Sequence, residues 1–151
     1  HLATLPRTGQ DETRNHVVVT CETCHRGQAM PHTLEQRLQI VLDGQGRDSA
    51  VAAYRMLREQ YYGRATFDFG EGRLVGLGSQ LVAAGKPDDA LALLTLNLEF
   101  HPRSTSTVTV MGDAHAALGH RDEAIRHYRW ALELEPRNQQ ARQRLERLQQ
   151  P

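Results

Sequence analysis

The chain has 151 residues, and 39% of them are hydrophobic, which is enough for one or two small packed domains. Its 18 basic and 18 acidic side chains balance, without the positive excess typical of proteins that bind nucleic acid or anionic membranes. No apolar stretch approaches the roughly 20 residues of a membrane-spanning helix. We therefore expect no nucleic-acid partner and no membrane span in this chain.

The first feature in chain order is a short cysteine motif, Cys21-Glu22-Thr23-Cys24-His25. It has the C-x-x-C-H spacing by which haem c is attached to proteins. Cys21 and Cys24 are the only cysteines of the chain, and each is expected to form a thioether with one vinyl group of the porphyrin. His25 follows directly, where it is expected to bind the iron as proximal ligand. The motif predicts one covalently bound haem c per chain.

The same cysteines have alternative uses. A thioredoxin-like redox pair needs a surrounding βαβ unit, and the sequence shows no such alternation. A zinc site would need two further ligands, which the eight histidines could supply, but it would leave His25 unused. A disulfide across so short a loop would stabilise little. Zinc binding and thiol redox chemistry remain the alternatives to haem.

The residues around the motif resemble a known family. Residues 19–27, with Pro31 shortly after them, resemble a haem segment of the photosynthetic reaction-centre cytochrome c subunit family, which also has soluble relatives in non-phototrophic bacteria. The lead-in at residues 1–17 is similar as well, so the likeness covers about residues 1–32. The resemblance implies an electron-transfer cytochrome. It also implies a periplasmic or extracellular location, since bacteria attach haem to this motif outside the cytoplasm, and a start at His1 fits a processed product.

The distal iron ligand is less determined. In that family a helix just before the lead-in usually supplies a methionine, and this sequence starts after the corresponding position. Either the N-terminus has been trimmed, or the sixth ligand comes from elsewhere. Met30 and His32 follow His25 too closely to cross easily to the opposite face of the haem. His16 lies on the approach to the motif, and His1 lies where the ligand-bearing helix would end. We therefore expect His1 or His16 as the distal ligand, and a neighbouring copy of the chain is a further source.

An internal repeat begins after residue 70. At an offset of 34 residues, which is the tetratricopeptide period, Leu74, Leu77, Gly78, Leu81, Gly85, Asp89, Ala90, Leu94 and Pro102 return as Val108, Met111, Gly112, His115, Gly119, Glu123, Ala124, Tyr128 and Pro136. Small residues in this pattern allow two helices to approach closely, and proline ends the second helix. Residues 71–136 therefore resemble the tetratricopeptide family, with repeats at 71–102 and 105–136.

A degenerate copy and a cap flank these two repeats. Residues 34–62 have helical apolar spacing interrupted by Gly44-Gln45-Gly46, and a link at 63–72 carries two phenylalanines that we expect in the core. Residues 137–150 keep few apolar positions, as a capping helix does. We predict an all-α fold in which a haem-binding segment (1–32) precedes a tetratricopeptide solenoid with a C-terminal capping helix (33–151).

The remaining histidines and methionines have structural explanations. His101, His115, His120 and His127 show no metal-ligand spacing, and all but His115 are expected at turns or outer faces. The two methionines of the repeats, Met56 and Met111, are expected in the core. The sequence shows no nucleophile–base pair, phosphate loop or second haem motif. We therefore do not expect an enzyme, because a haem iron with two axial protein ligands has no open position for chemistry.

Two functions fit these features. The first is an electron-transfer cytochrome whose repeats assemble it with a redox partner or with the haems of neighbouring copies. The alternative is a scaffold or sensor protein with a structural or gas-binding haem. The concave face of the repeats should carry Val75, Ser79, Val82, Ala83, Thr109, Asp113, Ala116 and Ala117. Lysine and asparagine, which grip peptide carboxylates in such repeats, are not among them, so we expect self-assembly into a homo-oligomer, as a ring or an open filament.

Overall fold

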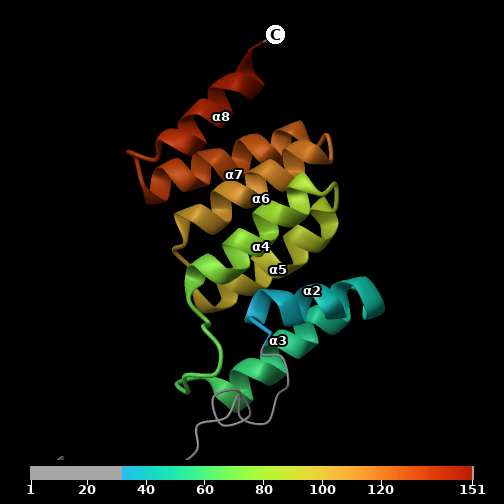
Figure 1. The fold of residues 1–151 in the computed structure, drawn as a ribbon. Coiled ribbons are helices and arrows are strands. Elements are labelled where there is room, and N and C mark those ends of the chain that lie inside the picture. Colours follow the sequence, from blue (N-terminus) through green and yellow to red (C-terminus); the bar gives the residue numbers. More distant parts are fainter. Residues whose placement is uncertain (1–31, 151) are drawn as a thin grey trace, which may run out of the picture. The chain divides into compact units, whose positions relative to one another are not determined.

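A computed structural model describes residues 32–150, and this part of the chain contains helices and turns but no strand, as the all-α prediction requires (Figure 1). Its helices are α2 (Leu34–Gln45), α3 (Arg47–Tyr61), α4 (Glu71–Ala83), α5 (Pro87–Phe100), α6 (Thr105–Ala117), α7 (Arg121–Leu134) and α8 (Gln139–Gln149). None of these helices combines the length and the apolar character needed to cross a membrane.

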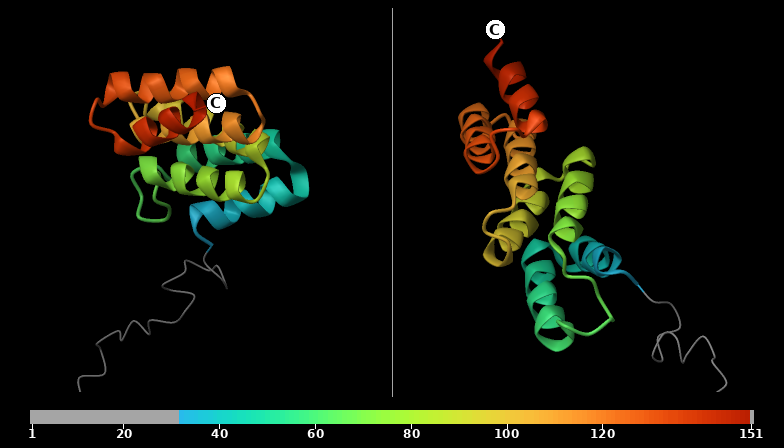
Figure 2. Two further views of the ribbon diagram at one scale, coloured as in Figure 1. Left: turned by 90° about the horizontal axis from the view of Figure 1, so that it is seen from above. Right: turned by 90° about the vertical axis from the view of Figure 1, so that its left-hand side faces the viewer.

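The helices form three hairpin-like pairs that follow one another along a stack (Figures 1 and 2). Helix α2 packs on α3, α4 on α5, and α6 on α7, while α8 packs on the last pair. Successive pairs meet through α3 with α5 and through α5 with α6. Helix pairs that each contact only their neighbours are the arrangement that the 34-residue repeat predicts.

Local sequence signals explain where the helices begin. Thr33 caps α2 with a capping box, in which its hydroxyl accepts from Gln36 N at 3.3 Å and its own N–H donates to Gln36 Oε1 at 2.9 Å. Ser104 caps α6 and Asn138 caps α8 through equivalent bonds of 3.0 Å. Each such cap contributes about 1 kcal/mol to helix stability. Pro87 occupies the first turn of α5, where its missing N–H costs nothing.

Two glycines at equivalent repeat positions end the first helix of their pairs. Gly85 and Gly119 have φ values of 74° and 76°, a left-handed conformation that strains any residue with a Cβ atom. The N–H of the residue after each glycine then bonds back to the helix in the same way in both pairs, from Lys86 to the Leu81 carbonyl at 2.8 Å and from His120 to the His115 carbonyl at 2.9 Å. The repeat in sequence is therefore also a repeat in backbone geometry.

Two other glycines set the distance between the paired helices. A Cβ atom built on Gly78 would lie 2.8 Å from Cδ2 of Leu94, and one built on Gly112 would lie 2.7 Å from Cδ1 of Tyr128. These separations are shorter than carbon atoms tolerate without displacement. In these two pairs, only glycine on the first helix allows the second helix to place a large side chain against the backbone of the first helix.

The first pair departs from this rule and relies on aromatic packing. Leu38, which is fully buried, stands where the other pairs have glycine. The link between α3 and α4 carries Phe67 and Phe69; Phe69 is buried and Phe67 packs against the core, as predicted. The ring of Phe69 lies 5.6 Å from that of Tyr54 on α3, and Tyr54 also lies 5.8 Å from Phe100 on α5. Edge and tilted contacts of this kind join the first pair to the second.

A buried polar network joins the second pair to the third. Asn97 on α5 is fully buried, although the equivalent residue of the next repeat is Ala131. Its amide donates to the Glu71 carbonyl at 3.1 Å and to Thr107 Oγ1 at 2.7 Å. Ser104 bonds to Thr107 and to the Glu71 carboxylate. Because these donors and acceptors lie in a low-dielectric interior, they fix how α4 and α6 begin relative to α5.

We expect Gly112→Ala to lower the free energy of unfolding by about 1–3 kcal/mol, because the new methyl group displaces the Tyr128 ring. The control is Gly76→Ala on α4, where an added Cβ meets nothing within 4 Å. There alanine should stabilise the helix by about 0.5–1 kcal/mol. Urea unfolding followed by circular dichroism measures both, and an equal gain in the two variants would contradict the close approach at Gly112.

Candidate functional site

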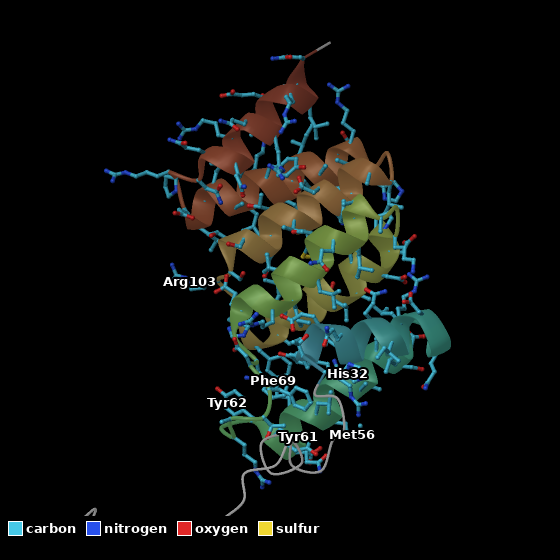
Figure 3. All side chains as sticks on the ribbon, in the orientation of Figure 1. His32, Met56, Tyr61, Tyr62, Phe69 and Arg103 are labelled. Carbon is cyan, nitrogen blue, oxygen red and sulfur yellow. The ribbon has the colours of Figure 1, made fainter. Side chains whose placement is uncertain are left out.

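The residues predicted to bind haem lie outside the described part of the chain. These are Cys21, Cys24 and His25, together with the distal candidates His1 and His16 and the less favoured Met30. His32 is the first described residue and directly precedes the cap of α2, where its side chain is half-buried (Figure 3). The site that the structure itself shows must therefore be built from the helical repeats.

The concave face of the second pair is open as predicted. Along α4, Ser79 and Ala83 are exposed, while Val75 and Val82 are half-buried and pack against the core with their inner atoms. This stretch offers a partner an apolar strip interrupted by a single hydroxyl. Ala116 and Ala117 on α6 are also accessible.

The concave face of the third pair is different, and there the prediction for Thr109 is wrong. Thr109 is buried, and two residues at the start of α8 lie at that part of α6: Asn138 bonds to Thr109, and Ala141 shares a buried cluster with Val108. Its hydroxyl donates to the Thr105 carbonyl at 2.8 Å and accepts from Asn138 Nδ2 at 3.3 Å. The start of the capping helix therefore contacts a residue that the repeat pattern alone predicts on the partner-binding face.

Asp113 connects α6, α7 and α8. Its carboxylate accepts a hydrogen bond from the Tyr128 hydroxyl at 2.8 Å and an ion-paired hydrogen bond from Arg144 on α8. Burial and the bond to Asp113 raise the pKa of Tyr128 well above its ordinary value, so this phenol stays a donor at all physiological pH values. A shallow pocket of about 300 Å³ opens beside the three side chains, and Arg147 and Leu148 line its outer edge.

The accessible surfaces of the second and third pairs therefore differ chemically. The strip on α4 is apolar, and the wall formed by α8 contributes the guanidinium groups of Arg144 and Arg147. Arg144 is already paired with Asp113, whereas Arg147 forms no ion pair within residues 32–150. Arg147 can therefore bind a carboxylate or a carbonyl oxygen of a partner.

Three histidines that lie apart in the sequence meet in the third pair. The ring of His115 on α6 lies 4.8 Å from that of His127 on α7 and 5.9 Å from that of His120 in the turn between them. His120 is exposed as expected, but His127 is half-buried, and so is His101 after α5. His101 lies at the turn after α5, as predicted, although neither its side chain nor that of His127 is fully exposed. Among residues 32–150, no three metal-binding side chains are arranged to hold an ion.

A second surface feature lies at the ends of α3 and α5. The guanidinium of Arg58 stacks 4.1 Å from the ring centre of Tyr62 and 4.2 Å from that of Phe100. Met56 on α3 is 59% exposed, so its predicted place in the core is wrong, whereas Met111 is buried as predicted. Figure 3 shows Met56, Tyr61, Tyr62 and Phe69 at this end of the helical stack. The stacked arginine covers aromatic faces that would otherwise be open to water.

Comparison with known proteins bears on the helical part. No family model and no curated protein matches the chain. Among solved structures, the first TPR domain of the human RPAP3 protein is 21% identical with a TM-score of 0.53, covering 79% of this chain and 91% of that one. The second TPR domain of human RPAP3, solved with the HSP70 peptide SGPTIEEVD, is 18% identical with a TM-score of 0.55, covering 79% and 94%.

The Arabidopsis OM64 TPR domain is 19% identical with a TM-score of 0.53, covering 77% of this chain and 91% of that one. Identities this low establish the fold and nothing finer. The tetratricopeptide (TPR) fold predicted from the 34-residue period is thereby confirmed for the helical part of the chain.

We expect Arg144→Ala to lower the free energy of unfolding by about 1 kcal/mol, because Asp113 loses a charged donor while the pair is partly exposed. Amide hydrogen exchange in α8 should become faster, since Arg144 joins that helix to α6. Arg129→Ala on α7 removes the same charge from an exposed position and serves as the control. If exchange in α8 is unchanged in Arg144→Ala, the link through Asp113 does not hold α8.

Proposed function

We propose that this chain is a c-type cytochrome for electron transfer whose TPR fold assembles it with other proteins. The observation that carries the proposal is one chain with an intact C-x-x-C-H motif at residues 21–25 followed by a stack of TPR-like helix pairs. The motif supplies the cofactor, and the stack supplies the type of surface on which proteins assemble. The two features belong to different parts of the chain, so they can be tested separately.

The donor set of the motif suits haem c. The two thiols are the groups that form thioethers with the porphyrin, and an imidazole follows them directly, where haem c proteins have the proximal ligand. Cys21 and Cys24 would hold the macrocycle, His25 would bind one face of the iron, and His1 or His16 would bind the other. When bound, the haem supplies a one-electron couple. With both axial positions filled by protein groups, we propose electron transfer and no enzymatic reaction.

The same motif underlies the proposed location. Bacteria complete haem attachment to C-x-x-C-H outside the cytoplasm, so a periplasmic or extracellular protein is proposed. The partner is then a redox protein of that compartment or the haem of another copy.

The TPR part supports a role in assembly. The second TPR domain of RPAP3 was solved with an HSP70 peptide, and that domain shares this fold at 18% identity. Here the accessible strip on α4 carries no lysine or asparagine, and Thr109 of the third pair is buried. These features favour close packing against another folded surface over capture of an extended peptide end. A second copy of the chain is the partner we propose, giving a homo-oligomer.

A scaffold or sensor role with a structural or gas-binding haem is the second candidate. It shares the cofactor and differs in the sixth iron ligand, because gas binding needs an open position. Carbon monoxide added to the reduced protein separates the two, since a haem with two tightly bound protein ligands gives no new spectrum.

We expect the native protein to carry one haem, which adds roughly 616 Da to the polypeptide mass. Cys21→Ser with Cys24→Ser should abolish covalent attachment, and the control change Ser49→Ala, at a half-buried position of α3, should leave it intact. Intact-protein mass spectrometry and a visible spectrum measure the result. An unmodified mass from native material, or one zinc per chain by elemental analysis, contradicts the proposal.

We expect the haem-loaded protein to form a multimer that dissociates on dilution, measured by light scattering. Ser79→Glu places a charge in the apolar strip of α4 and should shift the midpoint of dissociation at least tenfold towards higher protein concentration. Gln80→Glu is the control, because neighbouring helix residues point about 100° apart and both positions are exposed. A monomer at every concentration, with haem intact, would exclude self-assembly and leave another protein as the partner.

A further inference from the structure

The histidine cluster of the third pair stands where the second pair has leucines. At the 34-residue offset, His115 corresponds to Leu81 and His127 to Leu93. Both leucines are buried in the core, at 2% and 0% exposure. The third pair therefore has two imidazoles, with ring centres 4.8 Å apart and planes 30° apart, at positions that a helix pair of this fold otherwise fills with hydrocarbon.

The two rings have unequal hydrogen bonding. Nδ1 of His127 lies 2.9 Å from the Glu123 carbonyl oxygen, which gives that ring a partner in either charge state. Nδ1 of His115 is buried and has no hydrogen-bond partner within the described residues. A proton added to His115 would therefore place a charge beside an unsatisfied polar atom, with a second imidazole stacked against it.

The charged groups around His115 do not offset the cost of protonating it. His127, Glu123 and Arg126 face it from α7 and His120 from the turn, and Arg121 and Asp122 line the adjacent pocket. Burial, followed by His127 and His120, lowers the pKa of His115 below its ordinary 6.5, and Glu123 opposes this only in part. Folding therefore favours neutral His115. The unfolded chain takes up its proton first, so stability is lost as the pH falls below about 6.5.

We propose that His115 and His127 form a proton-sensitive contact that loosens the α6–α7 pair in mildly acidic surroundings. At neutral pH the two rings pack against each other, at positions where the preceding repeat buries two leucines. Below about pH 6.5, a proton on the half-buried His115 ring, which the adjacent His127 opposes, draws water into the contact. Because α8 packs on α7 and bonds to Asp113 of α6, it is the next element to loosen.

The test compares thermal unfolding of the full-length protein at about pH 7.5 and about pH 5, on either side of the histidine range. His115→Leu restores the residue of the preceding repeat. It should reduce the fall in Tm between the two pH values by about 2–4 °C relative to the wild type. His127→Leu should reduce the fall as well, since it removes the stacked imidazole. His32→Gln, which removes a histidine that precedes α2, should leave the fall unchanged.

Ring NMR of the intact chain gives a reading that does not depend on unfolding. The His115 resonance should titrate below 6.5 in the wild type and move upward in His127→Leu, while remaining below 6.5 because burial is the larger cause. The proposal is overturned if both leucine variants show the same fall in Tm between the two pH values as the wild type. A His115 ring that titrates at its ordinary value overturns it as well.

Discussion

The contact between a bare glycine and a large side chain of the paired helix determines the spacing on which the repeats depend. Gly78 against Leu94 and Gly112 against Tyr128 bring the two helices of a pair close enough to bury both with few large residues. The aromatic content of the chain is only 5%, and most of it lies in the first pair and its link. In the second and third pairs, close packing therefore comes from the short distance between the helix backbones, whereas in other cores bulky side chains fill the space.

The first pair lacks this glycine contact, because Leu38 stands at that position. Its junction with the second pair is made by the aromatic link and by ion pairs such as Arg55 with Glu99 at 2.7 Å. The exposed ion pairs add little individually. The aromatic rings and the stacked Arg58 bury more surface, so the link of residues 62–70 is a structural part of the stack.

Most of the helical fold could be predicted from sequence because it depends on local chemistry at a fixed period. The turns and helix caps depend on hydrogen bonds between residues that are close in sequence, as at Gly85, Gly119, Ser104 and Asn138. The small residues between helices recur at the repeat period. The burial of Thr109 could not be predicted in this way, because it depends on where α8 lies. Met56 was placed in the core from repeat position alone, and the irregular first pair exposes it.

The candidate sites were harder to predict for the same reason. Asp113, Tyr128 and Arg144 come from three helices, and no spacing in the sequence marks them as partners. Spacing along the chain does not relate the histidines to one another, whereas the fold brings His115 and His127 together across a hairpin. Comparing the repeat copies would have indicated these sites. A polar residue at a repeat position that is buried in the other copy needs a hydrogen-bond partner.

Position in the stack explains why the third pair carries these polar groups and the second does not. The second pair is covered on both sides, and its equivalent positions are Val75, Leu81, Leu93 and Leu94. The third pair has only α8 beyond it, so a hydroxyl, a carboxylate or an imidazole can reach water or a partner on that short helix. In a solenoid, each pair contributes to stability mainly through its neighbours. Polar chemistry at the last pair therefore costs the rest of the stack little, which makes that end the place where the fold can accept proton- or partner-dependent contacts.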